Sequence, residues 1–307
     1  MSAPMRDARA FEPDRSALRH IVHKTRGHRG SGPIARLMSP SDLGEVLKPF
    51  VFLDLFDMEA AGLRTMMAGM PLHPHSGIAT VTVLTEGRMR YDDPENGSGT
   101  IGYGGVEWMR AGAGVWHGGE MLVDDVPRLQ GFQLWLALPP AVENGTPVSR
   151  YVESKDMPRV GPAHVVIGRH ENAQSPVPAP DGLNYLLVTL RPGERWTYQP
   201  PAGHTVAWLA LAKGALSTDS DRVDAGEMAI FEPGNTRIRL EATGSADAVF
   251  VLGSAVPHPF PLHLGHYSVH TNATALAAGE RRIAELKRQL DAAGDRRTAS
   301  GTIPVFR

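Results

Sequence analysis

Residues 73–87 read HPHSGIATVTVLTEG. Most of this stretch is rich in β-branched residues and ends in glycine, which is typical of a β-strand that stops at a tight turn. Its first residues place two histidines one position apart. Because successive side chains of a strand point to opposite faces, His73 and His75 would share a face and could direct both imidazoles at one point. The chain contains 13 histidines, so a His-x-His pair alone is weak evidence of a metal site.

Similar short runs recur along the 307 residues, separated by many of the 33 glycines and 25 prolines. Many short strands with turn signals between them predict an all-β sandwich or barrel, the group that includes jelly rolls and cupins. The further candidate strands are FVFLDLF (50–56), LQGFQLWLAL (129–138), LNYLLVTL (183–190), TVAWLALAKG (205–214), EMAIFEP (227–233) and DAVFVLGS (247–254).

The two halves of the chain repeat one pattern of a strand ending in glycine, a glycine turn before another strand, and an apolar closing strand. The first half contains TVTVLTEGRMRY, GYGGVEWMRAG and FQLWLALP, and the second contains TVAWLALAKGALST, DAGEMAIFEPG and DAVFVLGSAVP. This repetition predicts a duplicated β-domain, with PPAVENGTPVSRY (139–151) as the connector.

The hydrophobic period changes to that of a helix after residue 270. Thr271 or Asn272 is a candidate N-cap, and the apolar positions suit one helical face, which predicts a helix that packs over a β-domain. These positions are Leu276, Ile283, Leu286 and Leu290.

Composition gives no indication of several classes of protein. The formal net charge of −2 gives no excess of positive charge for nucleic acid or an anionic membrane surface. No run approaches the length of a membrane span, and the N-terminus lacks the apolar region of a secretory signal, so we expect a cytoplasmic protein. Cysteine is absent, so any metal must use nitrogen and oxygen ligands.

Further potential ligands lie in EWMRAGAGVWHGGEM (107–121), where His117 and Glu120 follow a flexible Ala-Gly-Ala-Gly turn. Three imidazoles and a carboxylate without a thiolate suit iron(II), manganese, nickel or copper. They also resemble non-haem arrangements that leave coordination positions open for dioxygen and a substrate oxygen.

Taken together, the motifs resemble those of the pirin family, from about Arg19 to about Arg288. They occur in the same order as in that family and are KPFVFLDLF, HPHSGIATVTVLTEG, GGVEWMRAGAGVWHGGEM, GFQLWLAL, PAGHTVAWLALAKG and HYSVHTNATALAAG. The resemblance implies an all-β bicupin, two tandem jelly-roll barrels with a C-terminal helix. We expect an N-terminal arm (1–18), a metal-binding cupin domain (19–143), a metal-free cupin domain (144–270), and a C-terminal helix and tail (271–307).

The resemblance also implies one metal in the N-terminal barrel, usually iron(II), with manganese, nickel, copper or zinc as alternatives. Its ligands would be His73, His75, His117 and Glu120. Pirin-family members include quercetin 2,3-dioxygenases and nuclear proteins that act as iron-dependent transcriptional cofactors. We therefore expect a monomeric dioxygenase that acts on a flavonol-like aromatic substrate, with Glu120 as catalytic base. The alternative is a non-catalytic metal-binding regulator with a protein partner.

The sequence departs from the family pattern at three places. HPHRGFET of the family is HPHSGIAT here, so Ser76 and Ala79 replace a basic residue and a glutamate, and YGG replaces Pro-Gly-Asp. The His-x-Glu motif is extended to HGGE, which on a regular strand would turn Glu120 away from His117. Gly118 and Gly119 make a β-bulge plausible, which would bring Glu120 back to the metal.

Other residues have a structural and a functional interpretation. Six apolar side chains are either core or the lining of an aromatic-binding pocket: Val81, Met109, Val115, Trp116, Met121 and Phe132. His204, the lone histidine of the matching second-half segment PAGHTVAWLALAKG, lacks a His-x-His partner there. The C-terminal histidines His258, His263, His266 and His270 are expected to pack or lie at the surface, because two prolines prevent one helix from presenting them together.

Overall fold

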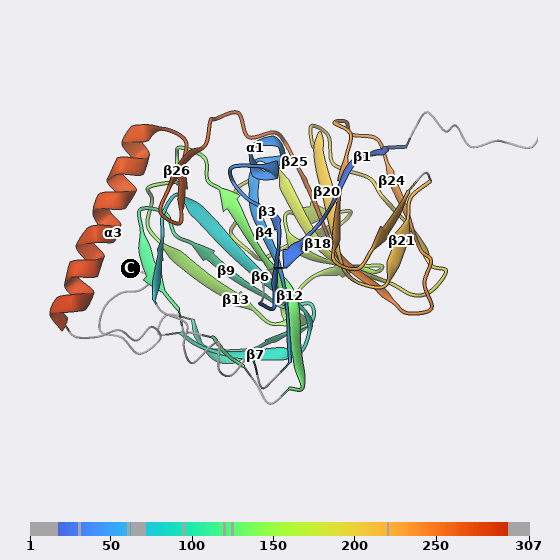
Figure 1. Cartoon of the computed structure of the whole chain (residues 1–307), viewed down its shortest axis with the longest axis horizontal. Helices are drawn as coiled ribbons and strands as arrows, with labels where there is room; N and C mark the ends of the chain where they lie inside the picture. Colours follow the sequence, from blue (N-terminus) through green and yellow to red (C-terminus); the bar gives the residue numbers. More distant parts are fainter. Residues whose placement is uncertain are drawn as a thin grey trace, which may run out of the picture.

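The structure is a computed structural model that describes residues 18–29, 32–59, 62, 72–93, 96–118, 121–123, 126–219 and 221–293. Two seven-stranded antiparallel sheets lie side by side at its centre (Figure 1). In spatial order, the first contains β13 (Val148–Val152), β9 (Val106–Arg110), β6 (Ile78–Glu86), β12 (Arg128–Ala137), β4 (Phe50–Glu59), β3 (Ile34–Met38) and β2 (His28–Arg29). The second contains β1 (Ile21–Arg26), β23 (Glu227–Phe231), β20 (Val206–Lys213), β25 (Ala248–Ala255), β18 (Leu183–Leu190), β15 (Ala163–Ile167) and β14 (Arg159–Val160).

Smaller sheets close each large sheet into a barrel. On the first barrel these are β5 (His73–His75) with β10 (Val115–His117), and β7 (Arg88–Asp93) with β8 (Gly97–Gly102) and β11 (Met121–Val123). On the second they are β19 (Arg195–Tyr198), β24 (Ile238–Ala242), β21 (Ala215–Ser217) and β22 (Arg222–Asp224), with the hairpin β16 (Arg169–His170) and β17 (Ala173–Gln174). The remaining elements are β26 (His263–Gly265), β27 (Ser268–His270), the helices α1 (Leu43–Leu47) and α3 (Ala273–Ala293), and the 3₁₀ turn η2 (Ser154–Asp156).

The two large sheets have the same strand order, which confirms the predicted duplication. Strands β9, β6, β12 and β4 of the first sheet correspond in position to β23, β20, β25 and β18 of the second. The edge strands come from unexpected places: β1 precedes the first barrel in the chain but pairs with β23, and β13 lies within the predicted connector but pairs with β9. The domain boundary at residues 143 and 144 stays a prediction.

Apolar side chains fill the space between the two large sheets. Val81, Leu134 and Trp108 from the first sheet and Trp208 and Val251 from the second belong to one buried cluster. The interior of the second barrel is filled by another apolar cluster. The first barrel contains two smaller apolar clusters, one with Trp135 and one with Leu84, and this leaves room for polar groups between them.

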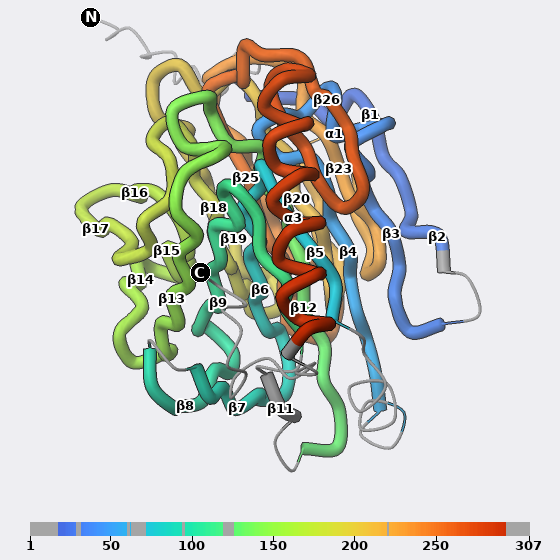
Figure 2. The backbone as a smooth tube through the Cα atoms, turned by 90° about the vertical axis from the view of Figure 1, so that its left-hand side faces the viewer, coloured from blue at the N-terminus to red at the C-terminus, as the bar shows by residue number. Residues whose placement is uncertain are grey.

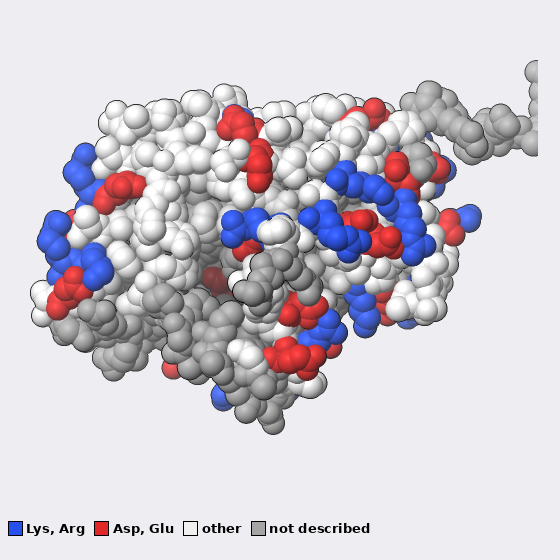
Figure 3. All heavy atoms as spheres, viewed as in Figure 1, with Lys and Arg blue, Asp and Glu red and all other residues white. Residues whose placement is uncertain are grey.

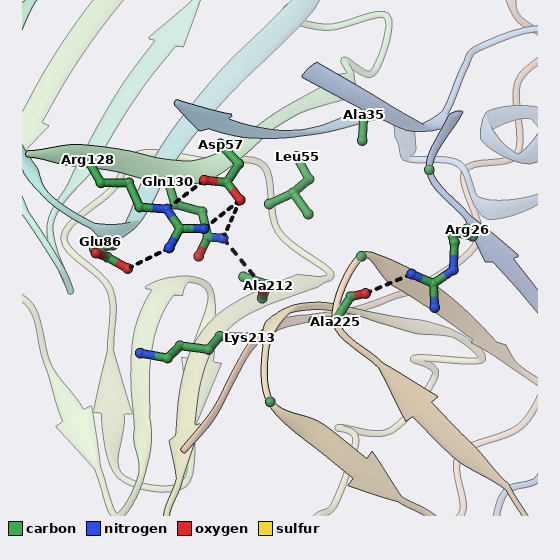
Figure 4. Close-up of a pocket in the computed structure, with 13 residues that line it drawn as sticks. Arg26, Ala35, Leu55, Asp57, Glu86, Arg128, Gln130, Ala212, Lys213 and Ala225 are labelled. Carbon is green, nitrogen blue, oxygen red and sulfur yellow. Dashed lines mark hydrogen bonds and ion pairs between the residues drawn. The ribbon is translucent and has the colours of Figure 1, made fainter. Parts of the chain in front are cut away.

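A pocket at the junction of the two barrels is lined by charged side chains, three of which, Arg128, Asp57 and Glu86, are engaged with one another (Figure 4). Arg128 donates from Nε and Nη2 to the two carboxylate oxygens of Asp57 at 2.7 and 2.8 Å. Gln130 Nε2 donates to Asp57 at 3.2 Å and to the carbonyl of Ala212 on the second barrel at 3.4 Å. The buried Gln130 therefore links the two barrels through hydrogen bonds.

Helix α3 lies along the side of the first barrel, with β26 and β27 next to it (Figure 2). Of the two predicted N-cap residues, Thr271 and Asn272, the cap is Asn272, whose Oδ1 accepts a hydrogen bond from the Ala275 amide at 2.9 Å. Leu286 and Leu290 are buried, whereas the outer face carries ion pairs such as Lys287 with Asp291. Figure 3 shows charges of both signs at the end of the molecule where this helix lies. None of the helices within the described residues combines the length and apolar character that a membrane crossing requires.

Trp116 of β10 connects the first barrel to this helix, because its indole Nε1 donates to the Ile283 carbonyl at 2.9 Å. We expect Trp116→Phe to lower the free energy of unfolding by about 1 kcal/mol more than Trp196→Phe, the typical net value of one hydrogen bond. Trp196 is a matched control, since it is also half-buried but donates no hydrogen bond among the described residues. Denaturant unfolding monitored by circular dichroism provides the comparison, and equal losses in the two variants would contradict this role.

Candidate metal centre

The pairing of β5 with β10 brings three histidines together. In this antiparallel ladder His73 lies opposite His117, and His75 lies opposite Val115. Directly opposed residues share a face, and so do residues two apart on one strand, so all three imidazoles are on the same side. The structure thus places His73, His75 and His117 in one group whose potential ligand atoms all lie within 4.8 Å of one another.

The arrangement of the rings suits a single ion. The ring centroids of His73 and His117 are 4.3 Å apart, and the ring centroid of His75 is 5.0 Å from each of them. Metal–nitrogen bonds of about 2.1 Å place ligand atoms roughly 3–4 Å apart around one ion. Small side-chain rotations therefore suffice to bring the three nitrogens to one metal.

The protonation state of the site also favours metal binding. Burial, together with the neighbouring His73, lowers the pKa of His75 to about 3, against the opposing effect of a hydrogen bond to the Tyr267 carbonyl. Burial and the other two histidines lower the pKa of His117 well below its ordinary value. Both rings are consequently neutral near pH 7, which is the form of histidine that coordinates metals.

A hydrogen bond orients the most buried of these rings, His75, which is 2% exposed. Its Nδ1 lies 3.0 Å from the backbone carbonyl of Tyr267, an acceptor, so Nδ1 carries the proton. Nε2 then presents its lone pair, as in metal sites whose second ring nitrogen is bonded to a carbonyl. Tyr267 has a φ of +56°, a conformation that non-glycine residues seldom adopt, and the sequence did not identify it as part of the site.

Known proteins share this organisation. Residues 33–136 match the family model described as Pirin. A pirin-like protein of Caulobacter vibrioides is 34% identical over 243 residues, which cover 76% of this chain and 86% of the relative. The chain belongs to the pirin family. A Pseudomonas aeruginosa relative provisionally named as a quercetin 2,3-dioxygenase is 28% identical over 236 residues, which cover 74% of this chain and 82% of the relative.

Two solved structures extend the comparison to the fold of this pirin-family chain. Quercetin 2,3-dioxygenase from Acinetobacter baumannii has a TM-score of 0.74 at 23% identity, covering 88% of this chain and 98% of its own. The bacterial pirin YhhW from Escherichia coli, solved in complex with nickel(II), has a TM-score of 0.55 at 18% identity, and the match covers 76% of this chain and 96% of YhhW. With the strand order above, these likenesses confirm the predicted bicupin fold.

The fourth predicted ligand of this pirin-family site, Glu120, lies outside the described residues, as does Gly119. Strand β10 ends at His117, and Gly118 has a φ of +139°, which favours glycine. The chain therefore leaves regular strand geometry immediately after His117. On a regular strand the HGGE spacing would turn Glu120 away from His117, but this argument does not apply where the strand has ended. The role of Glu120 as a ligand remains a proposal.

The sequence also did not identify a row of polar side chains inside the first barrel. Glu107, Thr82, Gln133 and Asp54 lie opposite one another on the neighbouring strands β9, β6, β12 and β4. Gln133 and Trp135 are two residues apart on β12, so the row shares a face with Trp135. The ring centroid of Trp135 is 4.9 Å from that of His75. The row therefore lies in the same barrel interior as the histidines, about 7 Å along the strands from the level of Trp135.

Glu107 and Thr82 are buried members of this row. The Thr82 hydroxyl is hydrogen-bonded to the Glu107 carboxyl and lies 2.9 Å from Gln133 Oε1. Burial raises the pKa of Glu107 to about 7, with Asp93 adding to the rise and the Thr82 hydrogen bond opposing it. The Thr82 hydroxyl has only one proton and cannot donate to both neighbours at once. When Glu107 is protonated, its carboxyl donates to the Thr82 oxygen, and the Thr82 hydroxyl donates to Gln133 Oε1.

The predicted pocket-lining residues divide into two groups. Val81 and Phe132 belong to the core between the large sheets, so they are not on the site's face. Met109 and Val115 pack in the cluster that contains Trp135 and Phe52, on the site's side. Of the other two, Trp116 contacts helix α3, and nothing is described for the Met121 side chain.

Both substitutions in the HPHSGIAT motif can be placed. Ser76 is buried, and its Oγ lies 2.9 Å from His270 Nε2 and donates to Ser268 Oγ at 2.9 Å. His270 Nδ1 is 3.4 Å from the buried Glu143, which accepts hydrogen bonds from both the amide and the hydroxyl of Thr271. This network joins the residue after His75 to the start of the segment that leads into α3. Ala79 is buried in the core between the large sheets.

Proposed function

We propose that this chain is a metal-dependent dioxygenase that acts on flavonol-like aromatic substrates such as quercetin. The observation that carries the proposal is the convergence of three imidazoles, from His73, His75 and His117, inside a cupin barrel, with the rings of His75 and His117 neutral near pH 7. The relatives named above for quercetin 2,3-dioxygenase activity support the substrate class.

The donor set fits a transition metal, and the chain has no cysteine to compete for it. His73, His75 and His117 would hold the metal, with Glu120 as the proposed fourth ligand. We propose iron(II), although the nickel(II) in a related bacterial pirin supports a site that accepts other divalent ions. When bound, the metal would supply Lewis acidity toward a substrate oxygen and an open position for dioxygen.

The protein's own side chains would position an aromatic substrate. Phe52 and Trp135 stack with ring centroids 4.1 Å apart, and Trp135 is edge-on to His75. Such a pair presents an apolar surface next to the histidines, where a planar ring can pack and exclude water. Flavonols carry an acidic enolic hydroxyl beside a carbonyl, and Glu120 is the proposed base for its proton.

Oxygen consumption tests this function directly. We expect protein reconstituted with iron(II) to consume dioxygen when quercetin is added under air, and Glu120→Gln to lower the rate about 100-fold or more through loss of the base. An oxygen electrode and the loss of the quercetin absorbance give independent readouts. One metal per chain without oxygen uptake for quercetin and related flavonols would contradict the dioxygenase and favour the metal-binding regulator.

A further inference from the structure

A pocket of about 590 Å³ opens at the mouth of the second barrel. It lies between the hairpin β16–β17, the loop that leads into β18, and the segment that joins β19 to β20. The volume is within the range of small-molecule sites, which is roughly 300–1,000 Å³. None of its lining residues belongs to the metal centre described above.

The pocket lies next to the place in the second barrel that corresponds to the metal centre in the first. Strand β20 corresponds to β6 by its position in the sheet, and the paired strands β19 and β24 correspond to β5 and β10. The segment from Gln199 to His204 therefore joins the same two elements as Ser76 and Gly77 do in the first barrel. In a duplicated fold, a cavity at the equivalent mouth is a natural second binding site.

A buried hydrogen-bond network fixes one wall of this pocket. His204 Nδ1 lies 3.0 Å from Ser254 Oγ, which lies 2.8 Å from the Tyr198 hydroxyl. Asn184 Nδ2 donates to the same hydroxyl at 3.0 Å. With Nδ1 engaged, Nε2 of His204 has no hydrogen bond to any described residue and remains available to a ligand.

The pocket also contains a second imidazole, that of His170. His170 is 6% exposed, and its Nε2 is buried without a hydrogen bond to any described residue. The nearest carboxylate oxygen, on Glu171, is 4.0 Å away, which is beyond hydrogen-bond distance. Leaving such a group unsatisfied costs about 1–3 kcal/mol. A ligand hydroxyl that reaches this enclosed nitrogen, once the ring turns toward the pocket, therefore gains affinity.

The other lining groups favour a neutral ligand with an apolar body. Burial lowers the pKa of both His170 and His204, so neither ring offers a positive charge near pH 7. The guanidinium of Arg169 donates to Gln174 at 2.6 Å. Its positive charge is outnumbered by the exposed carboxylates of Glu171 and Asp181, so the rim is net negative and repels anions. Much of the remaining wall is apolar and rigid, and it is formed by Val177, Ala179, Pro180, Pro200 and Pro201.

We propose that this pocket binds a small neutral aromatic molecule carrying hydroxyl groups, whose hydroxyls hydrogen-bond to Nε2 of His170 and of His204. A hydroxyl both donates and accepts, so it satisfies an imidazole nitrogen in either tautomer. The flat ring packs against the proline wall. This site is independent of the metal centre and of the activity proposed for it.

Catechol, titrated into the full-length protein, tests the proposal. To keep catechol from the metal, the titration uses the His75→Ala variant as background, alongside wild type. We expect saturable binding by calorimetry in His75→Ala, weakened about tenfold or more by His170→Leu or His204→Leu, since each removes one hydrogen-bonding partner. The matched control is His164→Leu, which removes a buried histidine of the same barrel outside this pocket.

A measurement on protein with both pocket histidines intact guards against variants that fail to fold. Catechol should shift the backbone amide signals of residues 168–182 and 197–205 in nuclear magnetic resonance spectra. Benzoate and glucose should bind at least tenfold more weakly than catechol. The proposal is overturned if His75→Ala binds no catechol, if the pocket variants bind as well as the control, or if benzoate or glucose binds better.

Discussion

Replacing His75 with alanine is expected to reduce the metal content from about one ion per chain to less than about a tenth of that value. His75 is the most buried of the three histidines and the one whose Nδ1 is held by the Tyr267 carbonyl. Loss of partners that merely orient a ligand already costs about 10–100-fold in metal affinity, so loss of the ligand itself should cost more. Oxygen uptake with quercetin should fall by more than about 100-fold.

His164→Ala is the matched control for this variant, because His164 is a buried histidine on β15 that lies outside the metal centre. It should keep full metal content, as measured by elemental analysis after reconstitution and desalting. Circular dichroism establishes that both variants are folded. A folded His75→Ala variant that keeps one tightly bound ion would contradict the assignment of this residue as a ligand.

The second large effect concerns the pH dependence of stability. The pKa of Glu107 is about 7 in the folded protein, against 4.5 for an ordinary glutamate, because its carboxyl is buried. Between these values the folded state holds a proton that the unfolded state has lost. Raising the pH through this window therefore destabilises the fold, by about 3 kcal/mol once the pH exceeds 7.

We expect Glu107→Gln to abolish this loss, since the amide keeps a neutral, near-isosteric group opposite Thr82. Denaturant unfolding at several pH values between 4.5 and 8 measures it, and the difference between variant and wild type isolates Glu107 from other titrating groups. Glu241→Gln, at the half-exposed ion pair with Arg195, is the control and should leave the pH profile unchanged. A stability difference between Glu107→Gln and wild type that is constant across pH would contradict the buried, protonated carboxyl.

The local pattern of the chain was sufficient to predict the strands at the centre of the fold. All seven predicted runs lie in the two large sheets, because β-branched runs bounded by glycine and proline carry their own signal. The edge strands could not be predicted in the same way. β1 pairs with a strand some 200 residues away, and β13 lies among turn residues, so their places depend on long-range pairing.

The parts of the candidate site that lie close together in the sequence were predictable. The parts whose position depends on tertiary contacts were less so. The His-x-His pair and His117 were identified from spacing and from the resemblance to pirins. Tyr267 contributes only a backbone carbonyl, which no side-chain pattern reveals. Glu107 interrupts the apolar run VEWM, but its burial opposite Thr82 follows from the pairing of β6 with β9.

The central claim is that the three histidines hold one metal. X-ray absorption spectroscopy of the iron(II)-reconstituted protein tests it most directly. Its extended fine structure distinguishes imidazole ligands by the scattering of their outer ring atoms. We predict three imidazoles around each ion, from His73, His75 and His117, and two after His75→Ala if any metal is retained. A wild-type spectrum with oxygen ligands alone, or with at most one imidazole, would contradict the account.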